Sequence, residues 1–287
     1  MASSNYERTH LLTIEPDTYW SMTSDIVDVE FDINGNILVC NSTDEIIKFN
    51  QQGKFLSKFS VGLNRKIKGM SCNKKGQIFM TDDNAKEVIV CDGKGQVTFT
   101  FLVSRDPIHP RGLVVSKETG DVFVVDSYAK NVLRFTEDGK SLKTFRPIGI
   151  YNEVKGNLVS PFYIALDSNQ NVLVNDTEQN RVQVFRPDDG QFVRSLRGCR
   201  HPGTSLEFLN QPNGIAVFEN GAVAVGSQAG LFVCKNESYG PILRRFDDKN
   251  SSNSIMGTKG IATYRNILAV ALSIANAEST IELFKDS

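Results

Sequence analysis

The stretch SPFYIALDSNQNVLVNDTEQNRVQVFRPDDGQFVRSLRG (residues 160–198) shows the building unit of this chain most clearly. Four short apolar runs, at 163–167, 172–174, 181–185 and 191–196, are separated by groups of Asn, Asp, Gly and Pro. In the third run Val182 and Val184 alternate with polar residues. Period-two alternation bounded by turn residues is the pattern of β-hairpins. The stretch therefore predicts four antiparallel strands and no helix.

The same unit recurs along the whole chain. We place the units at about 26–60, 68–101, 110–145, 161–198, 212–246 and 259–284. Equivalent positions in their first strands lie between 41 and 51 residues apart. A period of that length with four strands per unit is typical of propeller blades. The chain is thus predicted to be all-β, a single six-bladed β-propeller over residues 1–287. The equivalent positions are Asp28, Gly69, Gly112, Tyr163, Gly214 and Gly260.

The last unit lacks its outer strand, because only three strands fit before the end of the chain. The segment HLLTI at residues 10–14 precedes every other unit and is short and apolar. If it pairs outside residues 281–284, the ring closes without leaving an open, aggregation-prone edge. We therefore expect the N-terminal strand to complete the sixth blade. A disordered tail is the alternative.

Composition limits the class of protein. Of 287 residues, 40% are hydrophobic and 23% charged, which is ordinary for a globular protein. No apolar run reaches the roughly 20 residues of a membrane helix, and the first residues do not resemble a signal peptide. Five cysteines without a CxxC pair favour a reducing compartment, so a cytoplasmic protein is expected. The net charge of −1 gives no overall attraction for nucleic acid, and DNA is not expected as a partner.

The repeats resemble the NHL repeat, whose pattern is P-x-G-I-A, an apolar strand ending in Asp, N-R-V-Q-V-F and a D-x-G turn. Residues 160–198 match nearly throughout, and PRG at 110–112 and PNGIA at 212–216 match at the start of their units. Six such units are similar to the C-terminal propeller of the TRIM-NHL family. The resemblance implies post-transcriptional regulation and translational repression. The family's RING, B-box and coiled-coil parts are not in this sequence, so a ubiquitin-ligase RING would lie upstream.

Loops on one face of the predicted disc carry uneven charge. We define the top face as the one that bears the loop into each first strand and the loop between strands two and three. Basic residues exceed acidic ones by five over the loops at 61–68, 103–111 and 146–162. Glu15, Asp17 and Asp25 oppose them before the first blade. The alternative is that Asp83 and Glu87 neutralise the basic residues.

In five units, one residue directly precedes the equivalent position that is most often glycine, which we call the glycine column. These residues should surround the mouth of the central channel: Lys68, Arg111, Phe162, Asn213 and Lys259. Arg and Lys there suit phosphates, Phe offers a stacking face and Asn can read a base edge. Tyr163 replaces a glycine, and its ring either enters the site or fills core. The predicted RNA-binding residues are Arg65, Lys66, Lys68, Arg105, His109, Arg111, Tyr128, Tyr151, Phe162, Arg200, His201, Asn213 and Lys259.

Catalysis and metal binding are not expected. Asp82, Asp126 and Asp176 recur at the end of strand two, where Asp caps backbone amides. A metal site built from these carboxylates is the alternative. The zinc-dependent amidating lyase is a propeller of similar repeats, but zinc takes converging histidines. The chain has only His10, His109 and His201, which we do not expect to converge.

The sequence therefore predicts a non-enzymatic module with no cofactor and no metal. Its predicted partner is single-stranded, uridine-rich RNA in messenger RNA untranslated regions, bound on the top face, with protein co-repressors as possible further partners and no membrane. The alternative is a protein–protein interaction platform that recruits a substrate or repressor for a TRIM-type ubiquitin ligase.

Overall fold

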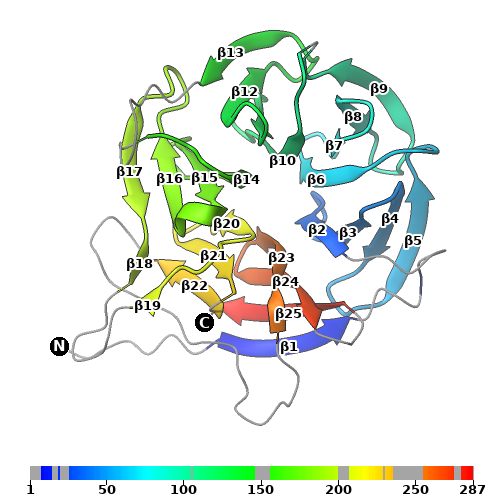
Figure 1. The fold of residues 1–287 in the computed structure, drawn as a ribbon. Helices are drawn as coiled ribbons and strands as arrows, with labels where there is room; N and C mark the ends of the chain where they lie inside the picture. The colour runs from blue at the N-terminus through cyan, green and yellow to red at the C-terminus, as the bar shows by residue number, and fades with distance from the viewer. Residues whose placement is uncertain are drawn as a thin grey trace.

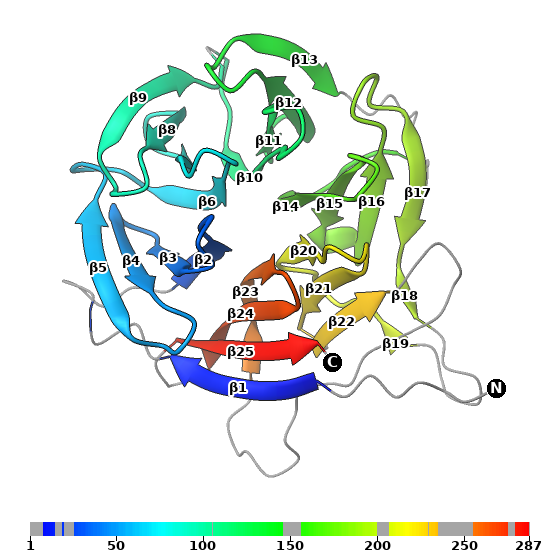
Figure 2. The same ribbon diagram turned by 180° about the vertical axis from the view of Figure 1, so that it is seen from behind.

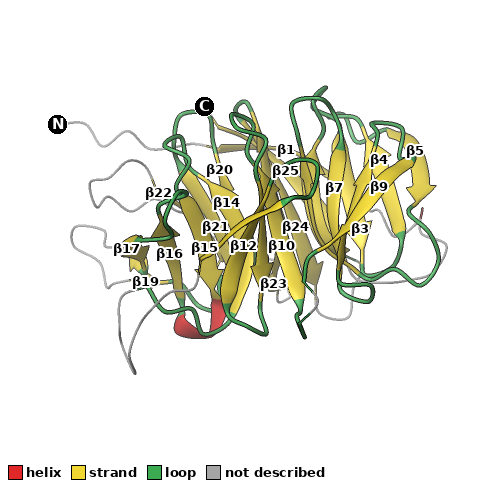
Figure 3. Ribbon diagram, turned by 90° about the horizontal axis from the view of Figure 1, so that it is seen from above, coloured by secondary structure: helices red, strands yellow, loops and turns green. Residues whose placement is uncertain are grey.

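The computed structural model describes residues 8–14, 19, 26–104, 106–145, 156–199, 207–228, 230–234, 255–274 and 279–286. These residues form a six-bladed β-propeller, with the sheets arranged around a central channel (Figure 1). Each blade is an antiparallel sheet whose first strand lies innermost. Seen from the edge, the strands of the blades run between the two faces of the disc (Figure 3).

The strands follow the chain in order around the ring. Blade one is β2 (Ile26–Phe31), β3 (Ile37–Asn41), β4 (Glu45–Phe49) and β5 (Phe55–Ser60). Blade two is β6 (Ile67–Cys72), β7 (Ile78–Asp82), β8 (Glu87–Cys91) and β9 (Val97–Leu102). Blade three is β10 (Pro110–Val115), β11 (Val122–Asp126), β12 (Asn131–Phe135) and β13 (Ser141–Phe145). Blade four is β14 (Pro161–Leu166), β15 (Val172–Asp176), β16 (Arg181–Phe185) and β17 (Phe192–Leu196), with a 3-10 turn η2 at Thr177–Gln179. Blade five is β20 (Ile215–Val217), β21 (Val223–Ser227) and β22 (Gly230–Cys234), and blade six is β23 (Ile255–Tyr264), β24 (Ile267–Ile274), β25 (Thr280–Asp286) and β1 (Arg8–Ile14).

Burial falls from the middle of each blade to its rim. All five residues are buried in each of the second strands β3, β7, β11, β15 and β21. The outer strands β5 and β9 are mostly exposed. A second strand is covered on both faces because neighbouring blades pack on either side, and so it reads as a continuous apolar run. Accordingly, each of six apolar clusters lies between two adjacent blades.

The N-terminal strand closes the ring, as the sequence predicted. β1 pairs antiparallel with β25, with Ile14 opposite Ile281 and His10 opposite Phe284 (Figure 2). Thr13 Oγ1 donates to Glu282 Oε2 over 2.9 Å. Ile14 is buried in the cluster between blades six and one. First and last strands are therefore held together by backbone hydrogen bonds and apolar packing.

Two features differ from the expected blade plan. A two-residue hairpin, β18 (Gly198–Cys199) with β19 (Glu207–Phe208), lies between blades four and five and was not predicted. The inner strand β23 begins at Ile255, earlier than the expected 259. The fourth strand expected near 241–246 lies outside the described residues. No helix in the described part of the chain is long and apolar enough to cross a membrane.

The first strands approach one another closely around the channel. A Cβ atom at Gly69 would lie 2.7 Å from Gly112 Cα, and one at Gly260 would lie 2.8 Å from Asp28 Cα. These distances are too short for a side chain, which explains the glycines of the repeating column. Blades one and four instead carry Asp28 and Tyr163 there. Tyr163 Oη donates to the carbonyl oxygen of Val27 over 2.9 Å, so its side chain crosses the channel to the opposite blade.

Candidate functional site

The loops leading into the first strands are held by the aspartates that end the second strands. Asp82 Oδ1 accepts the amide N–H of Lys66 at 2.9 Å, and Asp126 Oδ1 accepts that of His109 at 3.1 Å. Asp176 Oδ1 accepts the amide N–H of Ser160 at 2.8 Å. The capping role predicted for these three aspartates is confirmed. These bonds place Lys66 and His109 at equivalent positions of adjacent blades.

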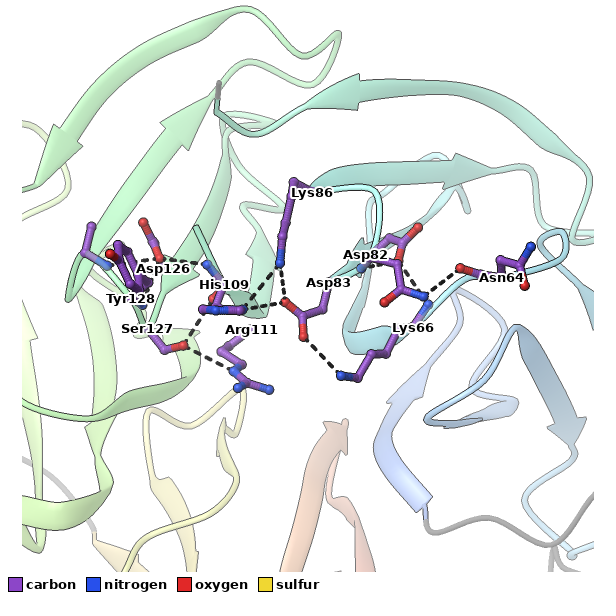
Figure 4. Close-up of polar contacts among 12 residues, drawn as sticks. Asn64, Lys66, Asp82, Asp83, Lys86, His109, Arg111, Asp126, Ser127 and Tyr128 are labelled. Carbon is purple, nitrogen blue, oxygen red and sulfur yellow. Dashed lines mark hydrogen bonds and ion pairs between the residues drawn. The ribbon is translucent and has the colours of Figure 1, made fainter. Parts of the chain in front are cut away.

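Asp83 gathers basic side chains from both blades at the mouth of the channel (Figure 4). Its Oδ1 is 2.9 Å from Lys86 Nζ and 3.0 Å from His109 Nδ1, and its Oδ2 is 3.5 Å from Lys66 Nζ. We call Asp83, Lys66, Lys68, Lys86, His109 and Arg111 the top cluster. It combines four permanent cations and one histidine with one carboxylate.

The other two cations of the top cluster are Lys68 and Arg111. Among the described residues, neither has a carboxylate within ion-pair distance. Arg111 Nε donates to Ser127 Oγ at 3.2 Å, and its guanidinium carbon lies 5.0 Å from the centre of the Phe162 ring. Lys68 is half-buried, and burial followed by the charges of Arg111 and Lys66 lowers its pKa below the ordinary value. In the top cluster, positive charges therefore outnumber negative ones at the channel mouth. Water reaches these cations only in part.

Asp83 is ionised among these cations. Burial alone would raise the pKa of Asp83, but hydrogen bonds from Lys86 and His109 and the charges of Lys86 and Arg111 outweigh it. The pKa of Asp83 therefore lies well below its ordinary range. Because His109 Nδ1 donates to this carboxylate, the basic lone pair of a neutral His109 is on Nε2.

Arg65 is paired with carboxylates of its own blade, and its predicted phosphate role stays a prediction. Its Nη1 is 2.9 Å from Asp82 Oδ2 and 3.1 Å from Glu87 Oε2. The predicted alternative, neutralisation by the neighbouring carboxylates, thus holds for Arg65 through Glu87 and Asp82. Asp83 neutralises the basic residues around it only in part, since its single carboxylate faces several cations.

The other predicted site residues divide into three groups. Tyr128 is 61% exposed beside His109, with ring centres 5.9 Å apart. Phe162 is half-buried beneath Arg111, while Asn213 and Lys259 are half-buried on blades five and six, away from the top cluster. Outside the described residues lie Arg105, Tyr151, Arg200 and His201, together with the acidic residues Glu15, Asp17 and Asp25.

A second polar region lies inside the channel and was not predicted from the sequence. Asp28 and Glu30 alternate on β2 and line a cavity together with Tyr163. Burial raises the pKa of Asp28 to about 8, against the opposing hydrogen bond from Met70 N–H, and burial also raises the pKa of Glu30. In the sequence, this region could have been noticed because Asp28 stands at the position where most units have glycine. Among the described residues, no group of three His, Cys, Asp or Glu could hold a metal ion.

Comparison with known proteins supports the fold. No family model matches the chain, so membership of the NHL repeat and TRIM-NHL families stays a prediction. A streptogramin B lyase structure matches with a TM-score of 0.63 at 14% identity, covering 97% of this chain and 88% of that one. A catalytically inactive His-to-Ala variant of virginiamycin B lyase from Staphylococcus aureus, with quinupristin, matches at a TM-score of 0.61 and 14% identity, covering 98% and 89%. Among curated proteins, peptidyl-glycine alpha-amidating monooxygenase of Mus musculus is 25% identical over an alignment of 199 residues that covers 62% of this chain.

These comparisons contradict the prediction that the chain is not an enzyme. The two lyases and the monooxygenase named above are enzymes, and this finding overturns the prediction, while the solved structures at 14% identity show the fold alone. The curated relative is moreover an amidating enzyme by name, the class that the positions of the three histidines had disfavoured. The chain spans about a fifth of that relative's length (20%). The fold is thus one that serves as a protein-interaction or enzymatic scaffold.

Proposed function

We propose that the top cluster binds the phosphates of single-stranded RNA. The supporting observation is that, among the described residues, Asp83 is the one carboxylate within ion-pair distance of Lys66 and Lys86, while Lys68 and Arg111 have none. Phosphates bind lysine and arginine, and the exposed Tyr128 ring beside His109 offers a stacking surface for a base. The finer proposal is a cytoplasmic protein that recognises uridine-rich messenger RNA in post-transcriptional regulation.

The test is fluorescence anisotropy of U-rich, A-rich and C-rich ten-mers at two salt concentrations. Lys68→Ala and Arg111→Ala should weaken binding of all three ten-mers. Each should reduce the log–log salt slope by about one for every phosphate that the variant no longer neutralises. Tyr128→Ala should cost roughly 1–3 kcal/mol of binding free energy. Lys74→Ala is the matched control, because Lys74 is exposed on the opposite face of the same blade.

Wild-type affinity weaker than about 100 µM for every ten-mer, at the limit of non-specific binding, would reject the RNA proposal. Binding that survives charge reversal at both Lys68 and Arg111 would reject the site. An acidic peptide, bound by the same cations, would then be the partner to test.

Acid–base catalysis at His109 is the second candidate function. It is favoured by the Asp83–His109 hydrogen bond of 3.0 Å, which fixes the ring and leaves Nε2 as the base. Arg111 and Lys86 lie beside it and would stabilise negative charge that develops on a substrate. The similar proteins support this candidate because they are enzymes, one of them inactivated by loss of a histidine.

Incubation with quinupristin, followed by mass spectrometry, tests this candidate on the ligand of the similar structure. A product formed by the wild type and by Tyr128→Ala, but not by His109→Ala, would support it. If liquid chromatography shows no new species with the wild type, either at the parent mass, as for a ring opened by elimination, or at another mass, this activity is rejected.

A further inference from the structure

The central channel contains a cavity of about 200 Å³ that is separate from the top cluster. It extends from the level of Asp28 and Tyr163 to Lys117 and Gln170 at the opposite face. The residues surrounding the mouth, among them Val27, Lys68 and Arg111, do not line it. The Tyr163 side chain, bonded across the channel to Val27, is therefore the upper end of the cavity.

The wall of this cavity has one polar and one apolar side. Blades one and two contribute Asp28, Glu30 and Ser71, and the positions equivalent to Glu30 and Ser71 in blades four to six are Ala165, Ala216 and Ala262, with Gln170 and Thr263 farther along the wall. Alanine leaves space where a larger side chain would fill the axis. The wall thus suits a molecule with a polar group at one side and a small apolar body.

The charge of the polar side favours a cation. Asp28 and Glu30 are both in the wall, and neither has an ion pair with any described residue. Both carboxyls are held by backbone donors: Asp28 Oδ2 accepts Met70 N–H at 2.9 Å, and Glu30 Oε1 accepts Phe31 N–H at 2.8 Å. Lys117, the one basic residue of the wall, is exposed at the lower end. A buried carboxyl without a charged partner is stabilised in its ionised form by a cation that enters.

The volume of the cavity and the ligand atoms in its wall favour an organic cation over a metal ion. A dry cavity of about 150 Å³ admits benzene, so the present one has room for a small organic molecule. In the described part of the chain, no three His, Cys, Asp or Glu residues lie where they could together hold a metal ion. Three alanines opposite the carboxyls contribute no ligand atom.

We propose that this channel cavity binds a small organic ammonium ion, with the ammonium group at Asp28 and Glu30 and the apolar body against the three alanines. The site is independent of the RNA proposal. It also predicts proton release, because the raised pKa of Asp28 means that a cation must displace its proton at neutral pH. The titratable groups that face Asp28 are Glu30 on β2, Cys40 on β3 and Tyr163 on β14, and the charge of Lys117, between β10 and β11, acts on Glu30.

Isothermal titration calorimetry with benzylamine, benzyl alcohol and benzoate tests the proposal, since the three probes share a ring and differ in charge. Benzylamine should bind at least about tenfold more tightly at pH 8 than at pH 6, because ionised Asp28 becomes available in that range. Buffers of different ionisation enthalpy should report proton release near pH 7. Benzyl alcohol and benzoate should bind much more weakly.

Variants distinguish a loss of binding in this cavity from a loss of folding and from effects at the top cluster. Asp28→Asn should remove most of the affinity for benzylamine and its pH dependence, and Ala216→Leu should abolish binding by filling the cavity. Glu30→Gln provides a second charge variant if Asp28→Asn does not fold. Lys68→Ala should lower RNA affinity and leave benzylamine binding unchanged. Equal binding of benzyl alcohol, or undiminished benzylamine binding by the folded charge variants, would overturn the proposal.

Discussion

Asp83 at the channel mouth and Asp28 inside the channel are both largely buried aspartates, yet their pKa values move in opposite directions. Asp83 has Lys86 and His109 within 3.0 Å, so the charged form is stabilised despite burial. Asp28 receives only backbone N–H groups, and burial keeps it protonated up to about pH 8. The difference shows that ionisation here depends on charged partners as well as on burial. The mouth therefore has an ionised carboxylate among cations, and the channel has a neutral carboxyl.

Deleting residues 1–14 should have the largest effect, because both aspartates depend on a closed ring. The deletion removes β1, exposes the edge of β25 and takes the buried Ile14 from its cluster. We expect a loss of several kcal/mol of unfolding free energy, as burial of one isoleucine alone contributes about 1.5–3 kcal/mol. Chemical denaturation followed by circular dichroism measures it. An unchanged midpoint would show that closure is not needed.

Asp28 should make the protein less stable as pH rises, which is the reverse of the usual aspartate effect. Its folded pKa of about 8 lies above the ordinary value of 3.8, so between these values the folded state binds a proton that the unfolded state lacks. Stability therefore falls with pH, by up to about 3 kcal/mol between pH 5 and pH 7. Denaturation at several pH values should show a flatter profile for Asp28→Asn. An identical profile in the variant would mean that Asp28 is ionised in the channel.

Asp83 should show the opposite sign at lower pH. Because its folded pKa is depressed, its contribution to stability is present above the unfolded value near 3.8 and is lost as pH falls through the folded value. Solvent screening reduces the effect to about 1 kcal/mol. Asp83→Asn should remove this loss below pH 4 and should tighten RNA binding by raising the positive charge. Weaker RNA binding would contradict the role of the other cations.

Arg65→Ala should have the smallest effect. Its charge is already paired with Asp82 and Glu87, so RNA affinity should change by less than about twofold, as for a surface pair. Lys68→Ala in the same loop is the comparison. If Arg65→Ala weakens binding as much as Lys68→Ala does, the two ion pairs of Arg65 open when RNA binds.

The candidate site could be predicted only in part from the sequence. Lys68 and Arg111 were assigned to the mouth because the repeat aligns them before the glycine column. Lys66 and His109 were assigned to the top face because they lie in the loops into the first strands, and the structure brings all four together. Neutralisation by Asp83 was foreseen as the alternative, but its contact with His109 could not be predicted, since Asp83 reaches His109 only across the boundary between two blades. Tests of RNA binding and catalysis must therefore treat the top cluster as one unit.

By itself the sequence determined the all-β class, the six blades and the ring closure by β1, because each depends on local period and on one missing strand. It also determined the caps at Asp82, Asp126 and Asp176, which act between nearby segments of one blade. The tertiary structure alone decided what happens across the channel. The inner strands converge so closely that Tyr163 reaches Val27 on the opposite blade and Asp28 loses its water. Such contacts depend on the radius of the closed ring, which no single repeat encodes.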